Sequence, residues 1–242
     1  MEGIPHHLLD VVEPGKPYSL ADFQPAAYAA IDDVLARGKT PILVGGTGLY
    51  VRAVTEGFQF SDSKPDPALR QELEQKSNAE LYAILREKTG VTLTGGEENN
   101  RHRLMRSVEK ALSGGWEAPK ASPRYDCLLL GVNFPRDVVC DRIDQRLQAR
   151  IDAGMLDEVA NLRAAGVSDE FLDRLGLEYR YILWYLTGKI PTLEGLKDEL
   201  GRAIKRFAKR QVVWFKKDKD VLWLNMAVSY THLRAHETDQ YR

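Results

Sequence analysis

The segment at residues 41–50, Pro-Ile-Leu-Val-Gly-Gly-Thr-Gly-Leu-Tyr, constrains the fold more than any other part of the sequence. Three apolar residues, two of them β-branched, lead directly into paired glycines, a threonine and a segment suited to a helix. This order is typical of a buried strand in an α/β sheet, and it predicts a strand over residues 41–45. The loop after such a strand places backbone N–H groups and the Thr47 hydroxyl where they can face an anion. Taken alone, Gly-Gly-Thr also fits a turn whose glycines serve only tight packing.

The neighbouring segments predict a parallel sheet accompanied by helices. Ser19 can cap a helix over residues 20–37, where apolar residues and alanines recur at helical spacing, and Gly38 can end it. A helix followed within a few residues by a strand favours parallel pairing. The apolar runs at 127–134 and 221–224 predict two further strands of the same sheet. The other periodic segments predict helices near residues 136–153, 155–165, 177–187 and 193–214.

The chain divides into a core and an insertion. A polar stretch with prolines at 58–66 marks a boundary, and residues 68–112 then follow a helical pattern that a Gly-rich break at 95–96 interrupts. We therefore expect an α/β core at residues 1–57 and 120–226 and a helical insertion at 58–119. Residues 227–242 fit neither pattern, and we interpret them as a non-native or disordered tail that is excluded from the site.

Charge and cysteine content narrow the class of protein. The 242 residues carry a formal net charge of −1, so any site for a polyanion must be a local patch. Cys127 and Cys140 have no Cys or His neighbours at metal-ligand spacing, which argues against a zinc site and fits a reducing cytoplasm. No leader and no membrane-spanning apolar run is evident, so we expect a cytoplasmic protein without a membrane partner.

Basic residues gather in two segments. Residues 202–219 hold eight Lys and Arg against one acid, and interleaved aromatic and apolar residues supply a face to bury. Arg101, Arg103 and Arg106 stand together near His102 in the helical insertion, with Glu109 as the one acid nearby. A solvated basic helix would explain either segment, but such a concentration on a nearly neutral protein favours RNA binding.

Other charged residues allow two interpretations. Arg142 and Arg146 share one helix face because they are four residues apart, and spacing alone favours a solvated ion-pair face with Asp141 and Asp144. Thr47 would also suit a helix N-cap. His6 and His7 have only Asp10 as a nearby carboxylate, so we interpret both histidines as structural, and Tyr50 as part of the core.

Several motifs in this order resemble the tRNA dimethylallyltransferases, also called tRNA isopentenyltransferases. Besides Gly-Gly-Thr, they are Ile-Pro-His-His-Leu-Leu-Asp at 4–10, Asn-Arg-His-Arg-Leu-Met-Arg at 100–106, Arg-Ile-Asp-Gln-Arg at 142–146, Gly-Leu-Glu-Tyr-Arg at 176–180 and Ala-Lys-Arg-Gln at 208–211. The resemblance covers roughly residues 3–225. It implies a P-loop-kinase-like parallel sheet with a helical RNA-binding insertion. It also implies transfer of a dimethylallyl group from its diphosphate to the N6 amine of the adenosine 3′ of the anticodon.

The resemblance also implies roles for particular residues. Arg146 and Thr47 would be catalytic, with Arg146 and Arg142 holding the diphosphate and Mg²⁺ shielding it. The expected tRNA contacts are Thr47, Arg70, His102, Arg103, Arg106, Arg180, Lys209 and Arg210. Partners would be dimethylallyl diphosphate and the anticodon stem-loop of tRNA, bound by a monomer, and no residue is assigned to a metal.

Two family motifs that stand ahead of the Ile-Pro-His-His segment are missing from this sequence. One is a P-loop of the Gly-x-Thr-x-x-Gly-Lys-Thr type, and the other is an Asp-Ser motif whose aspartate is taken as the general base. Gly-Lys-Thr at 38–40 precedes a predicted strand instead of a helix, so it is a turn. We therefore expect the first strand and the P-loop to be missing through truncation at the N-terminus, and the chain by itself to be inactive. The alternatives are a catalytically dead RNA-binding remnant, an isopentenyltransferase of free adenine nucleotides, and an unrelated P-loop kinase.

Overall fold

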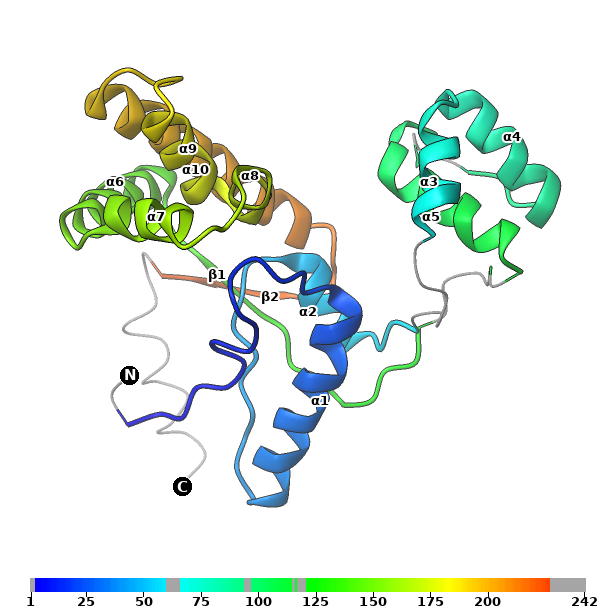
Figure 1. Ribbon diagram of the computed structural model, residues 1–242. Coiled ribbons are helices and arrows are strands. Elements are labelled where there is room, and N and C mark those ends of the chain that lie inside the picture. Colours follow the sequence, from blue (N-terminus) through cyan, green and yellow to red (C-terminus); the bar gives the residue numbers. More distant parts are fainter. Residues whose placement is uncertain (1–2, 60–65, 94–96, 115, 117–120, 227–242) are drawn as a thin grey trace, which may run out of the picture. The chain divides into compact units, whose positions relative to one another are not determined.

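The structure is a computed structural model that describes residues 3–59, 66–93, 97–114, 116 and 121–226 (Figure 1). Its contacts divide the chain into two units, each described here by itself. Unit 1 comprises Met1–Ala53 and Tyr125–Arg242, and unit 2 comprises Val54–Arg124. The predicted tail at 227–242, the Gly-rich break at 95–96 and most of the polar stretch at 58–66 lie outside the described residues. The predicted limits of the insertion at 58 and 119 stay a prediction.

Unit 1 contains a parallel sheet of two described strands. Strand β1 (Leu130–Asn133) pairs with β2 (Leu222–Asn225), so that Leu130 lies opposite Leu222 and Asn133 opposite Asn225. A Cβ at Gly131 would lie 2.8 Å from the Trp223 ring, so glycine is what allows this side chain to cross the strand. Parallel pairing and two of the three predicted strands are confirmed, although β1 is shorter at both ends than the predicted 127–134 and β2 is shifted by one residue from 221–224.

The strand predicted at residues 41–45 is wrong for the described structure, where this segment has no strand ladder. Ile42 and Val44 are 81% and 86% exposed, although their sequence pattern is that of a buried strand. A strand needs hydrogen-bonding partners on a neighbouring strand, and a parallel strand is normally covered on both faces. Among the described residues nothing supplies either, so the local pattern does not become sheet.

The other regular elements described in unit 1 are helices. They are α1 (Leu20–Ala36), α2 (Gly48–Thr55, which ends in unit 2), α6 (Arg136–Asp152), α7 (Met155–Ala164), α8 (Asp169–Leu175), α9 (Leu177–Leu186) and α10 (Leu193–Phe215). The Ser19 hydroxyl accepts a hydrogen bond from the Asp22 N–H, and the Asp22 carboxylate accepts one from the Ser19 N–H. This capping box confirms the predicted start of α1. The predicted helices over α6, α7, α9 and α10 are confirmed, whereas α8 was not expected.

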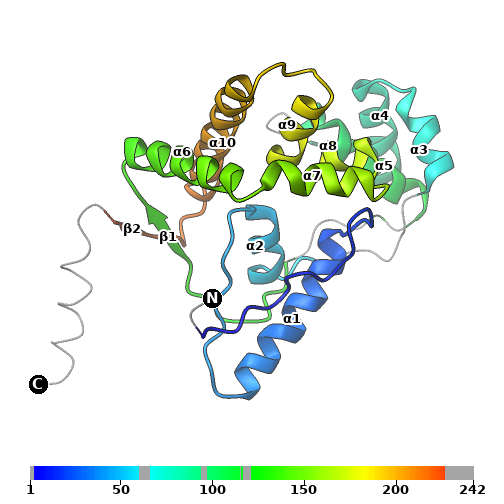
Figure 2. The same cartoon turned by 60° about the vertical axis from the view of Figure 1, so that its left-hand side comes forward.

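The core of unit 1 lies among its later helices. Helix α10 packs against α6 and α9, and α9 packs against α8 and α7 (Figure 2). Leu172, Ile182, Leu196 and Leu200 are fully buried between them. None of the described helices is long and apolar enough to cross a membrane.

Unit 2 is helical, as the pattern over 68–112 predicts. It consists of α3 (Pro67–Glu74), α4 (Asn78–Thr89), the 3-10 turn η1 (Glu97–Asn99) and α5 (Arg101–Leu112). Asp66 and Ser77 cap the starts of α3 and α4, and Gly90 ends α4 at a φ of +69° that favours glycine. Leu73, Leu81, Leu85, Leu104 and Val108 form a separate core. Unit 2 therefore has the apolar centre of a subdomain.

Candidate functional site

The glycine loop lies against the C-terminal part of α10. A Cβ added to Gly46 would lie 2.2 Å from Nε2 of Gln211, and one added to Gly48 would lie 2.1 Å from Cζ3 of Trp214. The end of the Gln211 side chain could move away from a Cβ, but the Trp214 ring is rigid, so Gly48 is the glycine that allows α10 to reach the loop. The contact brings Thr47 beside the Ala-Lys-Arg-Gln motif, which is 161 or more residues further along the chain.

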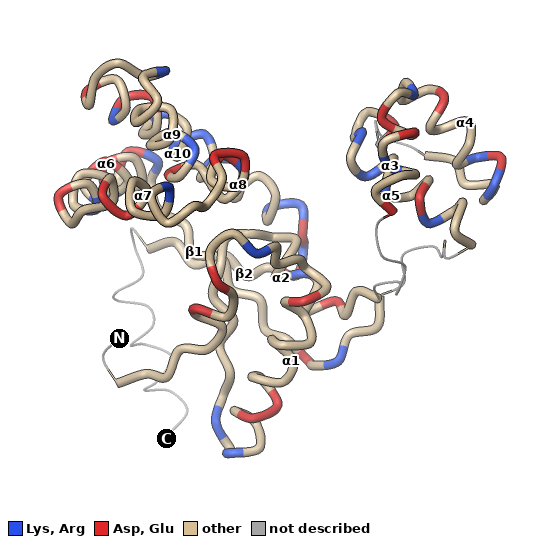
Figure 3. Tube along the Cα trace, viewed as in Figure 1, with Lys and Arg blue, Asp and Glu red and all other residues tan. Residues whose placement is uncertain are grey.

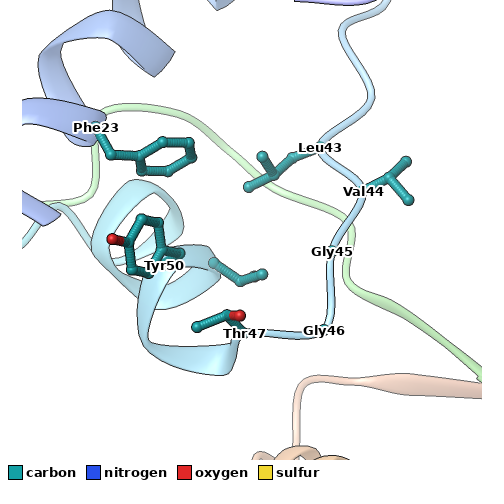
Figure 4. Close-up of a pocket in the computed structure, with 8 residues that line it drawn as sticks. Phe23, Leu43, Val44, Gly45, Gly46, Thr47 and Tyr50 are labelled. Carbon is teal, nitrogen blue, oxygen red and sulfur yellow. The ribbon is translucent and has the colours of Figure 1, made fainter. Parts of the chain in front are cut away.

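A hollow of about 220 Å³ opens beside this loop (Figure 4). Its lining comes from α1, the glycine loop and α2: Phe23, Leu43, Val44, Gly45, Gly46, Thr47, Tyr50 and Val51. Figure 4 shows the side chains of Phe23, Leu43 and Tyr50 directed toward one another and that of Val44 directed away. The rings of Phe23 and Tyr50 lie 4.8 Å apart between centroids. The hollow is thus mostly apolar and has the Thr47 hydroxyl at its margin.

Tyr50 is half-buried at this hollow instead of lying in the core as the sequence suggested. Burial raises the pKa of Tyr50, and the nearby Tyr18 and Asp22 raise it further. A phenol in these surroundings keeps its proton and can donate a hydrogen bond at neutral pH.

The Thr47 side chain is exposed, and its hydroxyl makes no hydrogen bond to any described residue. Its backbone carbonyl instead accepts from the N–H groups of Tyr50 at 2.9 Å and Val51 at 3.2 Å, which begins α2. The side-chain N-cap that would have explained this threonine structurally is therefore not formed. The hydroxyl remains available for a bound molecule.

The two arginines of α6 lie outside the core. Ile143 and Leu147 turn inward, whereas Arg142 and Arg146 are exposed. The Arg142 guanidinium lies 4.2 Å from the centre of the Phe134 ring, which follows β1. Arg146 forms no ion pair or hydrogen bond with a described residue. Asp144 instead pairs with Lys205 of α10, Nζ to Oδ2 at 2.6 Å, so the proposed ion-pair face does not include Arg146.

Helix α10 carries several Lys and Arg residues (Figure 3). Arg202, Arg206 and Lys209 are exposed and have no ion-pair partner among the described residues. The Arg210 guanidinium lies 5.5 Å from the Phe207 ring centre, which orients it without reducing its charge. These four charges, unlike that of Lys205, therefore remain available to a polyanion.

Arg180 is held by a residue that the sequence did not single out. Its Nε donates to the Asp173 carbonyl oxygen at 2.8 Å and to the Asp173 carboxylate at 3.3 Å. The same carboxylate accepts from Nε1 of Trp184 at 3.1 Å. Asp173 therefore fixes Arg180 on α9. The two residues are seven apart on different helices, so no helical spacing predicts this pair.

In unit 2, the predicted RNA contacts separate into three kinds. Arg70 and Arg106 both bind the buried carboxylate of Glu109. Arg101 holds the fold, because it donates to Asn78 Oδ1 at 3.1 Å and to the Glu74 carbonyl at 2.8 Å. His102 and Arg103 are exposed at the start of α5. In the sequence Glu109 is only an acid near these arginines, and no spacing indicates that its carboxylate binds two of them.

Metal ligands do not gather in the part of the chain that the structure describes. No group of three or more His, Cys, Asp or Glu side chains is positioned to hold an ion there. His6 contacts the Ile4 carbonyl oxygen through Nδ1 at 2.8 Å, a local bond that agrees with a structural role. The described residues therefore do not form a protein cage that fits Mg²⁺.

A small parallel sheet, a glycine loop against a basic helix and a separate helical unit define an α/β protein suited to bind anionic ligands. A family model described as IPP transferase matches residues 1–218. The chain belongs to the IPP transferase family, and the resemblance found in the motifs is thereby confirmed.

Relatives and solved structures agree with this placement. The tRNA dimethylallyltransferase of Exiguobacterium sibiricum is 41% identical over 233 residues, which cover 93% of this chain and 73% of that protein. The tRNA isopentenylpyrophosphate transferase of Bacillus halodurans superimposes with a TM-score of 0.69 at 32% identity, covering 99% of this chain and 78% of that one. A eukaryotic dimethylallyltransferase acting on tRNA shares the fold, with a TM-score of 0.73 at 23% identity, over 99% of this chain and 65% of that one.

Proposed function

We propose that this protein transfers a dimethylallyl group from dimethylallyl diphosphate to the N6 amine of the adenosine 3′ of the anticodon in tRNA. The observation that carries the proposal is the contact of the Gly-Gly-Thr loop with the end of α10. It sets an unbonded hydroxyl and an apolar hollow beside a basic helix. The hollow suits an apolar group, the basic helix suits an anion, and the Thr47 hydroxyl can bond a polar base. The names of the relatives give the transferred dimethylallyl group and tRNA, and the family resemblance implies the diphosphate donor and the N6 amine.

The chemistry requires stabilisation of a leaving group. A new bond forms between N6 and the first carbon of the allyl group, while the allylic C–O bond breaks and diphosphate leaves with the electron pair. Arg146 has no partner among the described residues, so its donors can strengthen their bonds as charge grows on diphosphate. Arg142, oriented by Phe134, would hold a second oxygen.

Two parts of the reaction are left to other groups. The amine must lose a proton, and the family resemblance implies that an aspartate takes it up as general base. Mg²⁺ remains a proposed companion of the diphosphate, because such ions are commonly held through substrate phosphates. The substrate would have to supply most of its ligands, since the described residues place no group of three or more His, Cys, Asp or Glu together.

RNA would be held by both units, each through its own basic residues. Lys209 and Arg210 lie on α10 next to the glycine loop, and Arg180 is fixed on α9. Arg70, His102, Arg103 and Arg106 lie on α3 and α5 of unit 2. Phosphate contacts of this kind set position, and unpaired bases in the loop provide the sequence to be read.

The test compares acceptors. The protein would be incubated with dimethylallyl diphosphate, Mg²⁺ and either tRNA or adenosine monophosphate, and the nucleosides analysed by mass spectrometry. We expect a dimethylallyl group on tRNA at the adenosine 3′ of the anticodon and none on the free nucleotide. Modification of the nucleotide alone would establish the alternative enzyme. RNA binding without transfer would support the catalytically dead remnant.

The assay also needs two forms of the polypeptide. Residues 1–242 contain no P-loop of the family type, and their Asp-Ser pair at 62–63 does not stand ahead of the Ile-Pro-His-His segment. A positioned general base typically contributes 10²–10⁴-fold to a rate, so we expect residues 1–242 alone to be slower by about this factor than a fusion in which the P-loop and Asp-Ser segment of a relative precede them. Equal turnover by the two forms would show that the base lies within residues 1–242.

A further inference from the structure

Two arginines of unit 2 share one carboxylate. Arg70 of α3 donates to Glu109 of α5 through Nε to Oε1 at 2.8 Å and through Nη2 to Oε2 at 3.0 Å. Arg106, one turn before Glu109 on α5, donates Nη1 to Oε2 at 3.1 Å. The Glu109 side chain is 3% exposed, whereas those of Arg70 and Arg106 are 42% and 30% exposed.

This geometry fixes both guanidiniums relative to each other. A bidentate bond aligns the plane of Arg70, and the third donor ties Arg106 to the same carboxylate. Glu109 is buried, so losing its partners would leave an unpaired charge in the apolar interior, which is strongly unfavourable. The two cations would otherwise repel each other, and the shared carboxylate is what holds them together.

Glu109 is a single carboxylate bound by two cations. Arg70, Arg106 and Glu109 by themselves sum to +1, whereas one arginine and Glu109 would form a neutral pair. The Nη1 group of Arg70 donates to no described residue, so donors remain on its exposed side. The surface therefore favours an anion that can reach fixed, planar donors.

We propose that Glu109 is a positioning residue for RNA, which fixes Arg70 and Arg106 as a rigid donor pair for a phosphate of the RNA backbone. The inference rests on the proposed binding of tRNA and goes beyond it, because it gives an acidic side chain a part in holding an acidic ligand. If Glu109 has this role, its removal should weaken RNA binding, whereas the change in net charge alone would strengthen it.

The test is the variant Glu109→Gln in the full chain. The amide has the same shape, but it has only one acceptor oxygen and presents its NH₂ to a guanidinium, so at least one arginine is released. If only net charge mattered, removing an acid should strengthen RNA binding. We expect the opposite. Affinity for an anticodon stem-loop should fall about tenfold, because the loss of one hydrogen bond to a charged group lowers an equilibrium constant by at least about that factor. The slope of log affinity against log salt should also become smaller in magnitude by roughly 0.7, which corresponds to the loss of one phosphate contact on a single strand.

Two controls separate positioning from folding. Glu72→Gln removes an exposed acid of α3 that has no side-chain partner among the described residues, and it should leave affinity unchanged or slightly higher. If Glu109→Gln fails to fold, as judged by circular dichroism and thermal unfolding, Arg70→Lys carries the test. It keeps the charge but cannot form the bidentate bond, so affinity should still fall several-fold, whereas Arg86→Lys on α4 should not change it.

The outcomes distinguish this inference from the proposed function. If the unaltered protein binds the stem-loop no better than an unrelated hairpin, the proposed function fails and the inference fails with it. If the unaltered protein binds and Glu109→Gln or Arg70→Lys binds equally well or better, only the positioning role is overturned. Weaker binding by a folded variant, with normal binding by its control, supports the role.

Discussion

At the scale of single residues, the structure distinguishes arginines that are already paired from those that can act on a ligand. Arg101 is used to hold α5 against the α3–α4 connection, and Arg180 is tied to Asp173. Arg146 has neither kind of bond to a described residue. Arginines in similar basic motifs therefore differ in how many donors they can offer to a ligand. The hydrogen-bond partners of each guanidinium show this difference, and the motifs do not.

Arg146→Ala should lower kcat by about 10²–10³ in steady-state transfer to tRNA, because one preorganised donor on a developing oxyanion has typically that effect. The tRNA affinity should change little, since the residue acts mainly in the transition state. Arg136→Ala is the matched control, as Arg136 is exposed on the same helix and has no side-chain partner among the described residues. Equal loss in both variants would contradict a specific role for Arg146.

Tyr179 predicts a pH dependence of stability. Burial, and donation of its hydroxyl to Glu158, raise the pKa of Tyr179 to about 12 from an ordinary value of 10.0. A raised folded-state pKa favours the neutral phenol, so its contribution is complete below pH 10 and is lost as pH rises from 10 to 12. The urea midpoint of the unaltered protein should therefore fall more steeply over this range than that of Tyr179→Phe. Parallel curves would show that the phenol does not contribute in this way.

At the scale of elements, the decisive feature is the close approach of α10 to the glycine loop. Gly48 begins α2, where alanine would ordinarily favour the helix by up to about 1 kcal/mol. Here its Cβ would lie 2.1 Å from the Trp214 ring. Packing and propensity therefore make opposite predictions for the same substitution.

We expect Gly48→Ala to destabilise the protein by about 1–3 kcal/mol, the usual cost of overpacking, because Trp214 must move. Urea denaturation would measure the loss. Gly45→Ala is the control, since a Cβ at Gly45 meets nothing within 4 Å. A Gly48→Ala protein as stable as its parent would mean that the end of α10 adjusts freely and does not define the site.

At the scale of the whole molecule, charge is distributed so that a nearly neutral protein can still bind a polyanion. The net charge of −1 provides no general attraction, while α10 and the first turns of α5 concentrate basic side chains. Binding should then depend on a few phosphate contacts in each unit, and its salt dependence should count them.

Replacing Arg103 and Arg106 together by alanine should reduce the magnitude of the slope of log affinity against log salt by roughly 1–2, at about 0.7 per contact on single strands. Replacing Lys209 and Arg210 should do the same through unit 1. Fluorescence anisotropy of a labelled anticodon stem-loop over a range of salt would measure both slopes. An unchanged slope in either double variant would remove that pair from the RNA-binding surface.

The local sequence determined much of the fold. Ser19 with Asp22, Ser77 with Glu80 and Gly90 set helix ends through bonds between residues three or four apart, and the apolar spacing of α5 predicted the burial of Leu104 and Val108. These interactions lie within a single element, so a linear pattern is sufficient to predict them. In α10 the expected face was wrong in part, because Phe207 and Val213 are 40% and 52% exposed and the buried residues lie earlier in the helix. The family follows from motifs that each occupy a short stretch.

The tertiary structure decided what depends on distant residues. Residues 41–45 have a strand pattern, but a strand forms only with a partner, and none is present among the described residues. Glu109 binds an arginine 39 residues away, and Gly48 meets Trp214. No period or spacing encodes such pairs, because their energies depend on how separate helices pack. The sequence thus determined the elements and the kind of chemistry, and packing decided which side chains can perform it.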